Sequence, residues 1–515
     1  MTGSTSQPAL SARLAPLSAA QLRALIVNAS EASPLARAAI EQASLAAIKA
    51  AETEPPPAPR AFLPLAKARS TAPDGRSDAI VVVDPLSSGA TLADLAQKRG
   101  FLIVRVLSRA FSDELMACLP AGCSALRWHA TVAWDADHPE KAVEALRGLD
   151  CHLLGILVGC ECGVECHDAL TTAFGGFPSN GVERSLTRRD KHPMGEAVRT
   201  AGLRAVKQKL CATWAEAEAF CVELGLRNEG ARCVLKPCKS AGTDGVYMVD
   251  SLIECRQRFD EIASSENVFG EDNAAVLVQE FMRGTEYVVD SVSVEGVHKC
   301  VAIWRYDKRP CNGAGFVYFA MELFQSDGGD REEALVDYVH QVLDALGCRH
   351  GPSHAEVMWL DGDDEPCLVE VGCRPHGGEG TFVDMVQPIM GHSQLSVMLD
   401  AVERPYRFHR LPKRPPRFSG GAFEVCLVAH EAGTLKGLPG LDAIRALPSY
   451  LSEEIKIEVG QPMPLTVDFL TTPGSIMLYS KDAAQLKKDF ETIHALCKQG
   501  LFVTLPPNRL RLKSL

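Results

Sequence analysis

The sequence predicts an α/β protein that begins with a parallel sheet and continues into antiparallel strands. Between residues 79 and 158, apolar runs such as AIVVV (79–83) and HLLGILV (152–158) alternate with helix-forming stretches, a pattern typical of parallel strands joined by helices. From about residue 276, strand-like runs follow one another across short turns, such as Glu295-Gly296, which favours antiparallel pairing.

Changes in composition divide the 515 residues into several regions. An Ala-, Ser- and Pro-rich start, with a helix expected at 18–51, precedes the first strand. In chain order, we expect an N-terminal extension (1–76), an N-terminal α/β domain (77–185), a small central α+β domain with a glycine-containing loop (186–283), and an antiparallel-sheet domain (284–515) whose small C-terminal subdomain starts at about residue 415.

The overall charge argues against two kinds of partner. The formal net charge of −12 does not favour nucleic acid or an anionic membrane held by long-range attraction.

No apolar run is long enough to predict a transmembrane helix. Many of the 18 cysteines lie in apolar runs and no secretory signal is evident, so we expect a reducing, cytoplasmic compartment. Organelle targeting by residues 1–76 is the open alternative.

A loop with little side-chain bulk follows an apolar strand at residues 234–246, VLKPCKSAGTDGV. Lys236 ends the strand, and the loop that follows is made mostly of small residues: Ser240, Gly242, Thr243 and Gly245. Small residues let backbone amides approach an anion, and a lysine adds charge, so the stretch is consistent with phosphate binding. An ordinary flexible turn is the alternative, because small residues are common in turns.

The strand at 276–280 leads into a second candidate binding segment. Its end could hold a nucleobase through backbone groups and apolar side chains, at Gln279, Glu280, Phe281 and Met282. Glu286 follows and could accept the hydroxyls of a ribose. The alternative is that both glutamates are solvated residues of an edge strand.

Two glutamates lie inside later apolar strands, Glu356 in HAEVMW and Glu370 in CLVEVG. If these strands pair across the acidic turn between them, both carboxylates face one site, where hard oxygen ligands suit Mg²⁺. A carboxylate in an apolar strand is costly unless it is paired or metal-bound. Arg374 follows and could neutralise a phosphoryl group or hold a substrate carboxylate. A structural salt bridge of the glutamates with Arg374 or His354 is the alternative.

Together and in this order, these motifs resemble the ATP-grasp superfamily over roughly residues 78–510. The resemblance implies a Rossmann-like N-terminal domain, a small lid domain and an antiparallel C-terminal domain. It implies ATP as the nucleotide and Mg²⁺ as the metal, with Mn²⁺ as an alternative. It assigns Lys191 (in RRDKHPMGEAVRTAGL) and Lys236 to the phosphates, QEFM to adenine, Glu286 to the ribose, and Glu356 with Glu370 to the metal.

Within that superfamily, the sequence is most similar to the L-amino-acid ligases that make dipeptides. Gly372 stands where many ATP-grasp enzymes have Asn, and the amino-acid ligase branch uses a later arginine, here Arg374. The resemblance implies an ATP-dependent carboxylate–amine ligase that works through an acyl phosphate on small-molecule substrates; a homodimer is common in the family. The alternatives are an inactive nucleotide-binding module and another ATP-grasp ligase or carboxylase.

The residues that would bind and activate the substrates are less defined by the sequence. The basic stretch 303–319 resembles by position a substrate-side loop, in which Arg305, Lys308 and Arg309 could bind carboxylates; a solvated basic loop is the alternative. An incoming ammonium must lose a proton, and either His376 or Glu379 could accept it.

A cluster of cysteines raises the question of zinc. Cys160, Cys162, Cys166 and His167 lack the paired C-x₂-C spacing of structural zinc sites. We therefore interpret the cysteines as small apolar residues without a metal.

Overall fold

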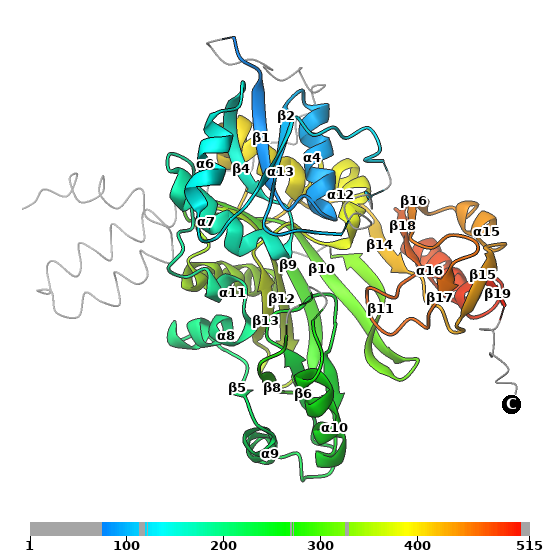
Figure 1. Cartoon of the computed structure of the whole chain (residues 1–515). Helices are drawn as coiled ribbons and strands as arrows, with labels where there is room; N and C mark the ends of the chain where they lie inside the picture. Colours follow the sequence, from blue (N-terminus) through cyan, green and yellow to red (C-terminus); the bar gives the residue numbers. More distant parts are fainter. Residues whose placement is uncertain are drawn as a thin grey trace, which may run out of the picture. The chain divides into compact units, whose positions relative to one another are not determined.

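A computed structural model of the chain describes residues 75–112, 119–120, 122–267, 270, 272–324 and 329–505 (Figure 1). The helix expected at 18–51 and nearly all of the expected extension lie outside these residues. The described part contains one parallel sheet and a large antiparallel sheet, together with two smaller antiparallel sheets. This mixed α/β arrangement agrees with the predicted fold class.

The N-terminal sheet is parallel, in the strand order β3-β2-β1-β4. Its strands are β1 (Asp78–Val83), β2 (Leu102–Leu107), β3 (Ala130–Ala133) and β4 (His152–Val158), and its helices are α4 (Ser88–Lys98), α6 (Pro139–Arg147) and α7 (Val164–Phe174). Alternate residues of β1 face opposite sides: Ile80 packs in the cluster with α4, and Val81 in the cluster with α6 and α7. Helices therefore cover both faces, and the ends of β1 and β4 are left to contribute to a site.

The central region is a small antiparallel sheet in the order β5-β8-β6-β7, with helices packed against it. It comprises α8 (Lys191–Thr200), β5 (Gln208–Cys211), α9 (Trp214–Glu223), β6 (Cys233–Pro237), β7 (Tyr247–Val249), α10 (Leu252–Ala263) and β8 (Val276–Glu280). The sequence analysis did not identify β5 as a strand. This short, polar strand owes its conformation to pairing with β8.

A large eight-stranded sheet, β13-β12-β9-β10-β11-β14-β18-β16, carries the carboxylates. Its first five strands along the chain are β9 (Gly284–Val294), β10 (Val297–Cys311), β11 (Ala314–Leu323), β12 (Gly351–Leu360) and β13 (Pro366–Gly372). The predicted turn at Glu295-Gly296 joins β9 to β10, both residues having positive φ. The expectation of a substrate-side loop at 303–319 is wrong, because those residues form the β10–β11 hairpin around the turn Asn312-Gly313.

Helices cover the large sheet. The predicted helix α11 (Asp330–Leu346) packs on the face that includes Val289 and Val357. Three helices that were not predicted follow β13: α12 (Phe382–Met390), α13 (Gln394–Glu403) and α14 (Pro405–Arg410). Phe382, Leu395 and Phe408 of these helices join Trp304 and the α4 face of the N-terminal sheet in one buried cluster. The N-terminal domain and the large sheet thus share a core.

The C-terminal segment is partly an extension of the large sheet. Strands β14 (Gly421–Cys426), β16 (Tyr450–Ile455) and β18 (Gly474–Ser480) add to it beyond β11. A three-stranded sheet, β15 (Gly433–Gly437), β17 (Pro462–Met463) and β19 (Val503–Leu505), lies in the same segment with helices α15 (Leu441–Arg445) and α16 (Ala483–Lys498), where one helix was expected. None of the helices in the described ranges has the length and apolarity needed to span a bilayer.

Candidate active site

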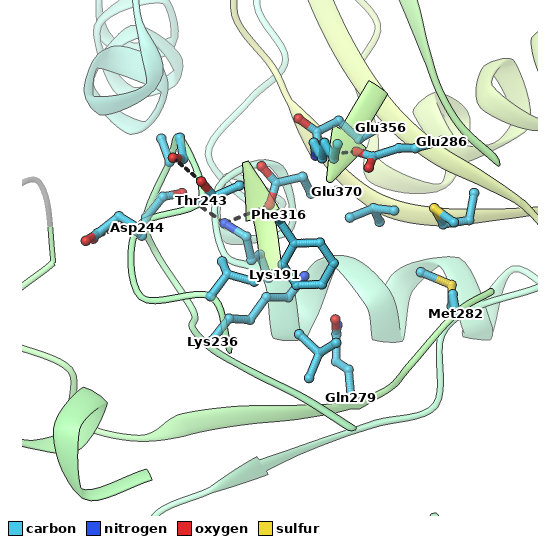
Figure 2. Close-up of a pocket in the computed structure, with 18 of the residues that line it drawn as sticks. Lys191, Lys236, Thr243, Asp244, Gln279, Met282, Glu286, Phe316, Glu356 and Glu370 are labelled. Atoms are coloured by element: carbon cyan, nitrogen blue, oxygen red, sulfur yellow. Dashed lines mark hydrogen bonds and ion pairs between the residues drawn. The ribbon is translucent and has the colours of Figure 1, made fainter. Parts of the chain in front are cut away.

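Most of the predicted site residues line one cavity, called here the first cavity (Figure 2). It lies between the small central sheet and strands β9 to β13 of the large sheet, and holds about 840 Å³ of empty space including its open mouth. The predicted residues along its walls are Lys191, Lys236, Ser240, Gly242, Thr243, Gln279, Glu280, Phe281, Met282, Glu286, Lys308, Glu356 and Glu370. Segments far apart in the sequence are thus brought to one space.

Two lysines concentrate positive charge in the first cavity. Lys191 begins α8, behind the N-cap Asp190, and its Nζ lies 2.9 Å from Glu370 Oε2 and 2.9 Å from the carbonyl oxygen of Ser240. Figure 2 shows Lys191 and Glu370 pointing toward one another. Lys236 ends β6 and is only 4% exposed; burial lowers its pKa to about 8, an effect that Glu370 opposes. The pair can neutralise an anion that displaces water from the cavity.

The loop between β6 and β7 folds over these lysines. Gly242, Thr243 and Gly245 all have φ near +65°, a conformation that glycine adopts readily and that strains Thr243. A hydrogen bond of 2.6 Å from Ser240 Oγ to Asp244 Oδ2 closes the loop. Gly245 does not line the cavity; a Cβ there would lie 2.9 Å from Pro237 Cγ, so glycine is needed for the return of the chain. The loop therefore exposes successive backbone groups at the cavity wall.

The end of β8 forms the opposite wall. The strand ladder ends at Glu280, and Phe281 and Met282 follow it along the cavity. The Glu280 carboxylate is used structurally, accepting hydrogen bonds from Arg204 (3.0 Å) and from the backbone N–H of Lys207 (2.8 Å). This segment therefore offers backbone groups and apolar side chains, rather than a free carboxylate, to a planar ligand.

Three carboxylates lie together where the large sheet borders the cavity. Glu356 of β12 stands directly opposite Glu370 of β13, which confirms the predicted pairing of these strands. Glu286 of β9 joins them, with its Oε1 2.6 Å from Lys308 Nζ, and that Nζ lies 3.9 Å from Glu356 Oε2. Glu370 pairs with Lys191 and not with Arg374 or His354, whereas His354 Nε2 lies 3.7 Å from Glu356 Oε1, so the structural alternative holds in part for Glu356.

Burial favours the neutral form of both carboxylates nearest Lys308, but their neighbours shift the two pKa values in different directions. Burial raises the pKa of Glu286 to about 7; Lys308 opposes this rise and Glu356 adds to it. For Glu356, burial also favours the neutral form, but Lys308 and His354 outweigh it and the pKa falls below its usual range. Glu356 is therefore ionised at neutral pH. With Glu370 it forms a donor set of hard oxygen atoms on paired strands, which fits Mg²⁺ or Mn²⁺.

A second cavity adjoins the first one. The two share Ala241, Gly242, Tyr318, Glu356 and Glu370 along their walls. The second cavity extends to the loop after β13, where Arg374, His376 and Glu379 lie, and to residues of the N-terminal domain and the C-terminal segment. Arg374 Nε donates to Glu161 Oε2 at 3.0 Å, and this ion pair joins the large sheet to the N-terminal domain. A ligand in either cavity would therefore meet the carboxylate pair.

A buried polar cluster beneath the second cavity was missed by sequence analysis. Asp290 of β9 is 1% exposed and accepts hydrogen bonds from His354 Nδ1 (2.8 Å), His376 Nδ1 (2.7 Å) and Trp304 Nε1 (2.7 Å). Burial would raise the pKa of Asp290, but His376 and His354 outweigh it and lower the pKa. A signal was present, since an aspartate within the apolar run YVVDSVSV is costly unless it is paired.

Some residues of the predicted substrate segment lie elsewhere. Arg309 lines neither cavity; its guanidinium pairs with Asp307 at 2.6 Å and lies over the ring of Phe319. Lys308, its neighbour on β10, lines the first cavity and contacts Glu286. The expectation that both bind substrate carboxylates is therefore not matched by their placement. Lys239 does not line the first cavity either; it pairs with Glu165 at 3.3 Å.

The cysteine cluster forms a different group from the one considered in the sequence. Cys160 Sγ and Cys162 Sγ lie 3.1 Å apart beside Asp84, and their ligand atoms are near enough to share an ion. His167 instead contacts the carbonyl oxygen of Ile156, and Cys166 packs in the N-terminal core. Asp84 already accepts two hydrogen bonds from Ser108. The absence of zinc stays a prediction.

Comparison with known proteins agrees with this geometry. Residues 229–382 match the ATP-grasp domain family. Dapdiamide A synthase of Enterobacter agglomerans is 30% identical over 420 residues, covering 81% of this chain and 95% of that protein. Alanine–anticapsin ligase of Bacillus subtilis (strain 168) is 22% identical over 44% of this chain and 49% of that protein.

Solved structures show the same fold. The L-amino acid ligase from Bacillus licheniformis superposes with a TM-score of 0.64 at 17% identity, covering 84% of this chain and 100% of that one. An N5-carboxyaminoimidazole synthase from Aspergillus clavatus, solved with ADP, gives a TM-score of 0.58 at 14% identity, covering 82% and 98%. The chain therefore belongs to the ATP-grasp family, as a carbon–nitrogen ligase of the kind that includes the L-amino-acid ligases.

Proposed function

We propose that this enzyme joins the carboxylate of one amino acid to the amine of another, using ATP and releasing ADP and phosphate. The observation that carries the proposal is the meeting of the two cavities at Glu356 and Glu370. A nucleotide in the first cavity and a carboxylate in the second would have their reacting ends at the same pair of strands. The relatives named above are amide-forming ligases, which supports the same assignment.

The first cavity supplies what ATP needs. Lys191 and Lys236 would hold the phosphates, the loop at 240–245 would cover them, and the segment at 279–282 would take the adenine. Glu356 and Glu370 would hold Mg²⁺, which when bound neutralises phosphate charge during transfer of the γ-phosphoryl group.

The remaining catalytic work is positioning and exclusion of water. A substrate carboxylate attacks the γ-phosphorus and becomes an acyl phosphate, which an amine then converts to the amide. Arg374, held by Glu161 at the border of the second cavity, is placed to neutralise the reacting carboxylate. The loop at 240–245 must stay closed over the acyl phosphate, because water would otherwise hydrolyse it.

The test is phosphate release from ATP and Mg²⁺ with the twenty amino acids, singly and in pairs. Release that requires two amino acids together is the expected result, and mass spectrometry of the product identifies the amide. Release with no amine present, or with bicarbonate alone, would instead favour another ATP-grasp ligase or a carboxylase. No release with any combination, together with a thermal shift on adding ATP, would favour an inactive nucleotide-binding module.

We also propose a reducing, cytoplasmic setting and a homodimer. All the described cysteines are free thiols, which supports the first part. Light scattering of the purified chain tests the second part, since a monomer mass at micromolar concentration would contradict it.

A further inference from the structure

Formation of an amide requires a base as well as an acyl phosphate. An amino acid carries its amine as an ammonium near neutral pH, and nitrogen cannot attack until it has lost a proton. Two groups of the second cavity could accept that proton, His376 and Glu379. Their surroundings differ enough to choose between them.

His376 is held at three points. Its backbone N–H donates to Gln394 Oε1 at 2.7 Å, and its Nδ1 lies 2.7 Å from Asp290 Oδ2. Its ring contacts those of His354, Trp304 and Phe382, with ring centroids 4.4 Å, 5.1 Å and 4.9 Å away. The imidazole is 3% exposed, and the surface it retains faces the second cavity. Its orientation is therefore fixed before any substrate arrives.

Asp290 also fixes which nitrogen of His376 carries the proton. A carboxylate accepts hydrogen bonds, so Nδ1 of His376 must be the donor, as the indole of Trp304 is at the same oxygen. The lone pair of the neutral ring is then on Nε2. Nε2 makes no hydrogen bond with any residue in the described ranges and is not sealed from the cavity. It is a free acceptor in a fixed position.

The charges around His376 keep the ring neutral. Burial lowers its pKa; Asp290 on β9 opposes this effect, while His354 on β12 and Arg374 on the same loop add to it. The acidic side chains on the wall of the second cavity are Glu161, Glu356, Glu370 and Glu379. A histidine that is neutral at physiological pH is ready to take a proton.

Glu379 is anchored by its backbone and not by its side chain. Its N–H donates to Ser87 Oγ and its carbonyl oxygen accepts from Thr91 Oγ1, while φ is +59°. Within the described part of the chain, no residue donates a hydrogen bond to its carboxylate. Nothing therefore orients that carboxylate toward the reacting atoms.

We propose that His376 Nε2 is the general base that deprotonates the acceptor ammonium, and that Asp290 positions it. This inference rests on the proposed function. One proton of the ammonium passes to Nε2, and the freed nitrogen pair forms the C–N bond at the acyl carbon. The C–O bond to the phosphate then breaks with its electron pair. The nitrogen loses a second proton to the departing phosphate, and Nε2 returns its own proton to solvent.

The test measures formation of the acyl phosphate separately from its reaction with the amine. Hydroxylamine is unprotonated at neutral pH and traps acyl phosphates without a base, so hydroxamate formation with each of the twenty amino acids reports the first half-reaction. Amide formation reports both half-reactions, and it is measured with the pair of amino acids that gives the highest turnover. His376→Asn keeps an amide donor toward Asp290 and removes the base; Glu379→Gln tests the alternative base, and Asp290→Asn tests the positioning residue.

We expect His376→Asn to keep hydroxamate formation within a fewfold of the parent chain and to lose amide formation by about 10²- to 10⁴-fold. The loss should shrink as pH rises and more free amine is present. Equal loss of both activities would show a structural role and overturn the inference, as would a selective loss in Glu379→Gln. Absence of hydroxamate from the parent chain with every amino acid would instead overturn the proposed function itself.

Discussion

The two cavities meet at one pair of carboxylates but are built in different ways. Most of the wall of the first cavity comes from strands and the loop that directly joins two of them, with charges already paired, as in Lys191 with Glu370. The second cavity is bordered by loops from the N-terminal domain, the end of β13 and the C-terminal segment. Rigid strands thus carry the part of the reaction common to all substrates, and loops carry the part that selects them.

The largest effect should come from the carboxylates common to both cavities. Glu370→Ala removes a proposed metal ligand and the partner of Lys191, so we expect turnover to fall by about 10³-fold or more, because the Mg²⁺ that it would help to hold neutralises the transferring phosphoryl group. Steady-state phosphate release measures this. Asp363→Ala, in the exposed turn of the same hairpin, is the control and should be active. ATP hydrolysis retained by a folded Glu370→Ala chain would contradict the assignment.

Two adjacent residues of β10 allow a sharper comparison, because Lys308 lines the first cavity and Arg309 lines neither cavity. Lys308→Met leaves Glu286 buried without its partner. We therefore expect the free energy of unfolding, measured in denaturant, to fall by about 3–5 kcal/mol and activity to fall strongly. Arg309→Met breaks a half-exposed ion pair with Asp307 and the contact of the guanidinium with the ring of Phe319, each worth about 0–1 kcal/mol. If Arg309→Met damaged activity as much as Lys308→Met, the placement of Arg309 outside both cavities would be contradicted.

The buried lysine of the first cavity should make ATP binding depend on pH. Because burial lowers the pKa of Lys236 to about 8, the free enzyme loses this positive charge as pH rises through that value. Only the protonated form attracts phosphate, so affinity for ATP should be highest below about pH 8 and fall by up to about tenfold per pH unit above it. Calorimetric titration across pH measures this. Lys236→Met should bind weakly and show no such inflection; an unchanged inflection would assign it to another group.

The smallest expected effect is that of removing transition metals. Cys160, Cys162 and Asp84 border the second cavity or lie behind it, but Asp84 is already satisfied by Ser108. We expect a chelator, with Mg²⁺ in excess, to leave the melting temperature unchanged. The mass of the folded chain should be that of the protein without a transition metal, both before and after the chelator is added. A clear drop in melting temperature would show that the thiol pair holds a structural ion and would change how the second cavity is described.

Local signals explain what could be predicted of the fold. The turn Glu295-Gly296 and the pairing of Glu356 with Glu370 followed from short-range patterns, and the structure confirms both. β5 was missed because its conformation depends on β8, almost seventy residues later. The β10–β11 hairpin was taken for a loop because its basic stretch resembles by position a substrate-side loop, although Asn312-Gly313 is a strong hairpin signal.

The candidate site likewise has one part that short sequence motifs predict and another part that only strand pairing brings together. The residues of the first cavity lie in contiguous motifs, such as VLKPCKSAGTDGV, whose spacing can be read without a structure. The Asp290 cluster joins β9, β10, β12 and the loop after β13, and no single stretch contains more than one of its members. Only the pairing of the strands brings Asp290, His354 and His376 together, so sequence could name His376 but not its partner.

The loop at 240–245 also reaches the C-terminal segment, where the N–H of Phe469 donates to the Gly242 carbonyl oxygen at 3.3 Å. Ala241 and Gly242 border both cavities, so one loop lies along both of them. Movement of this loop would admit or release nucleotide and amino acids together. ADP, phosphate and amide would then leave after one common opening step, and residues near Phe469 and Leu470 would set the turnover rate without touching the reacting atoms.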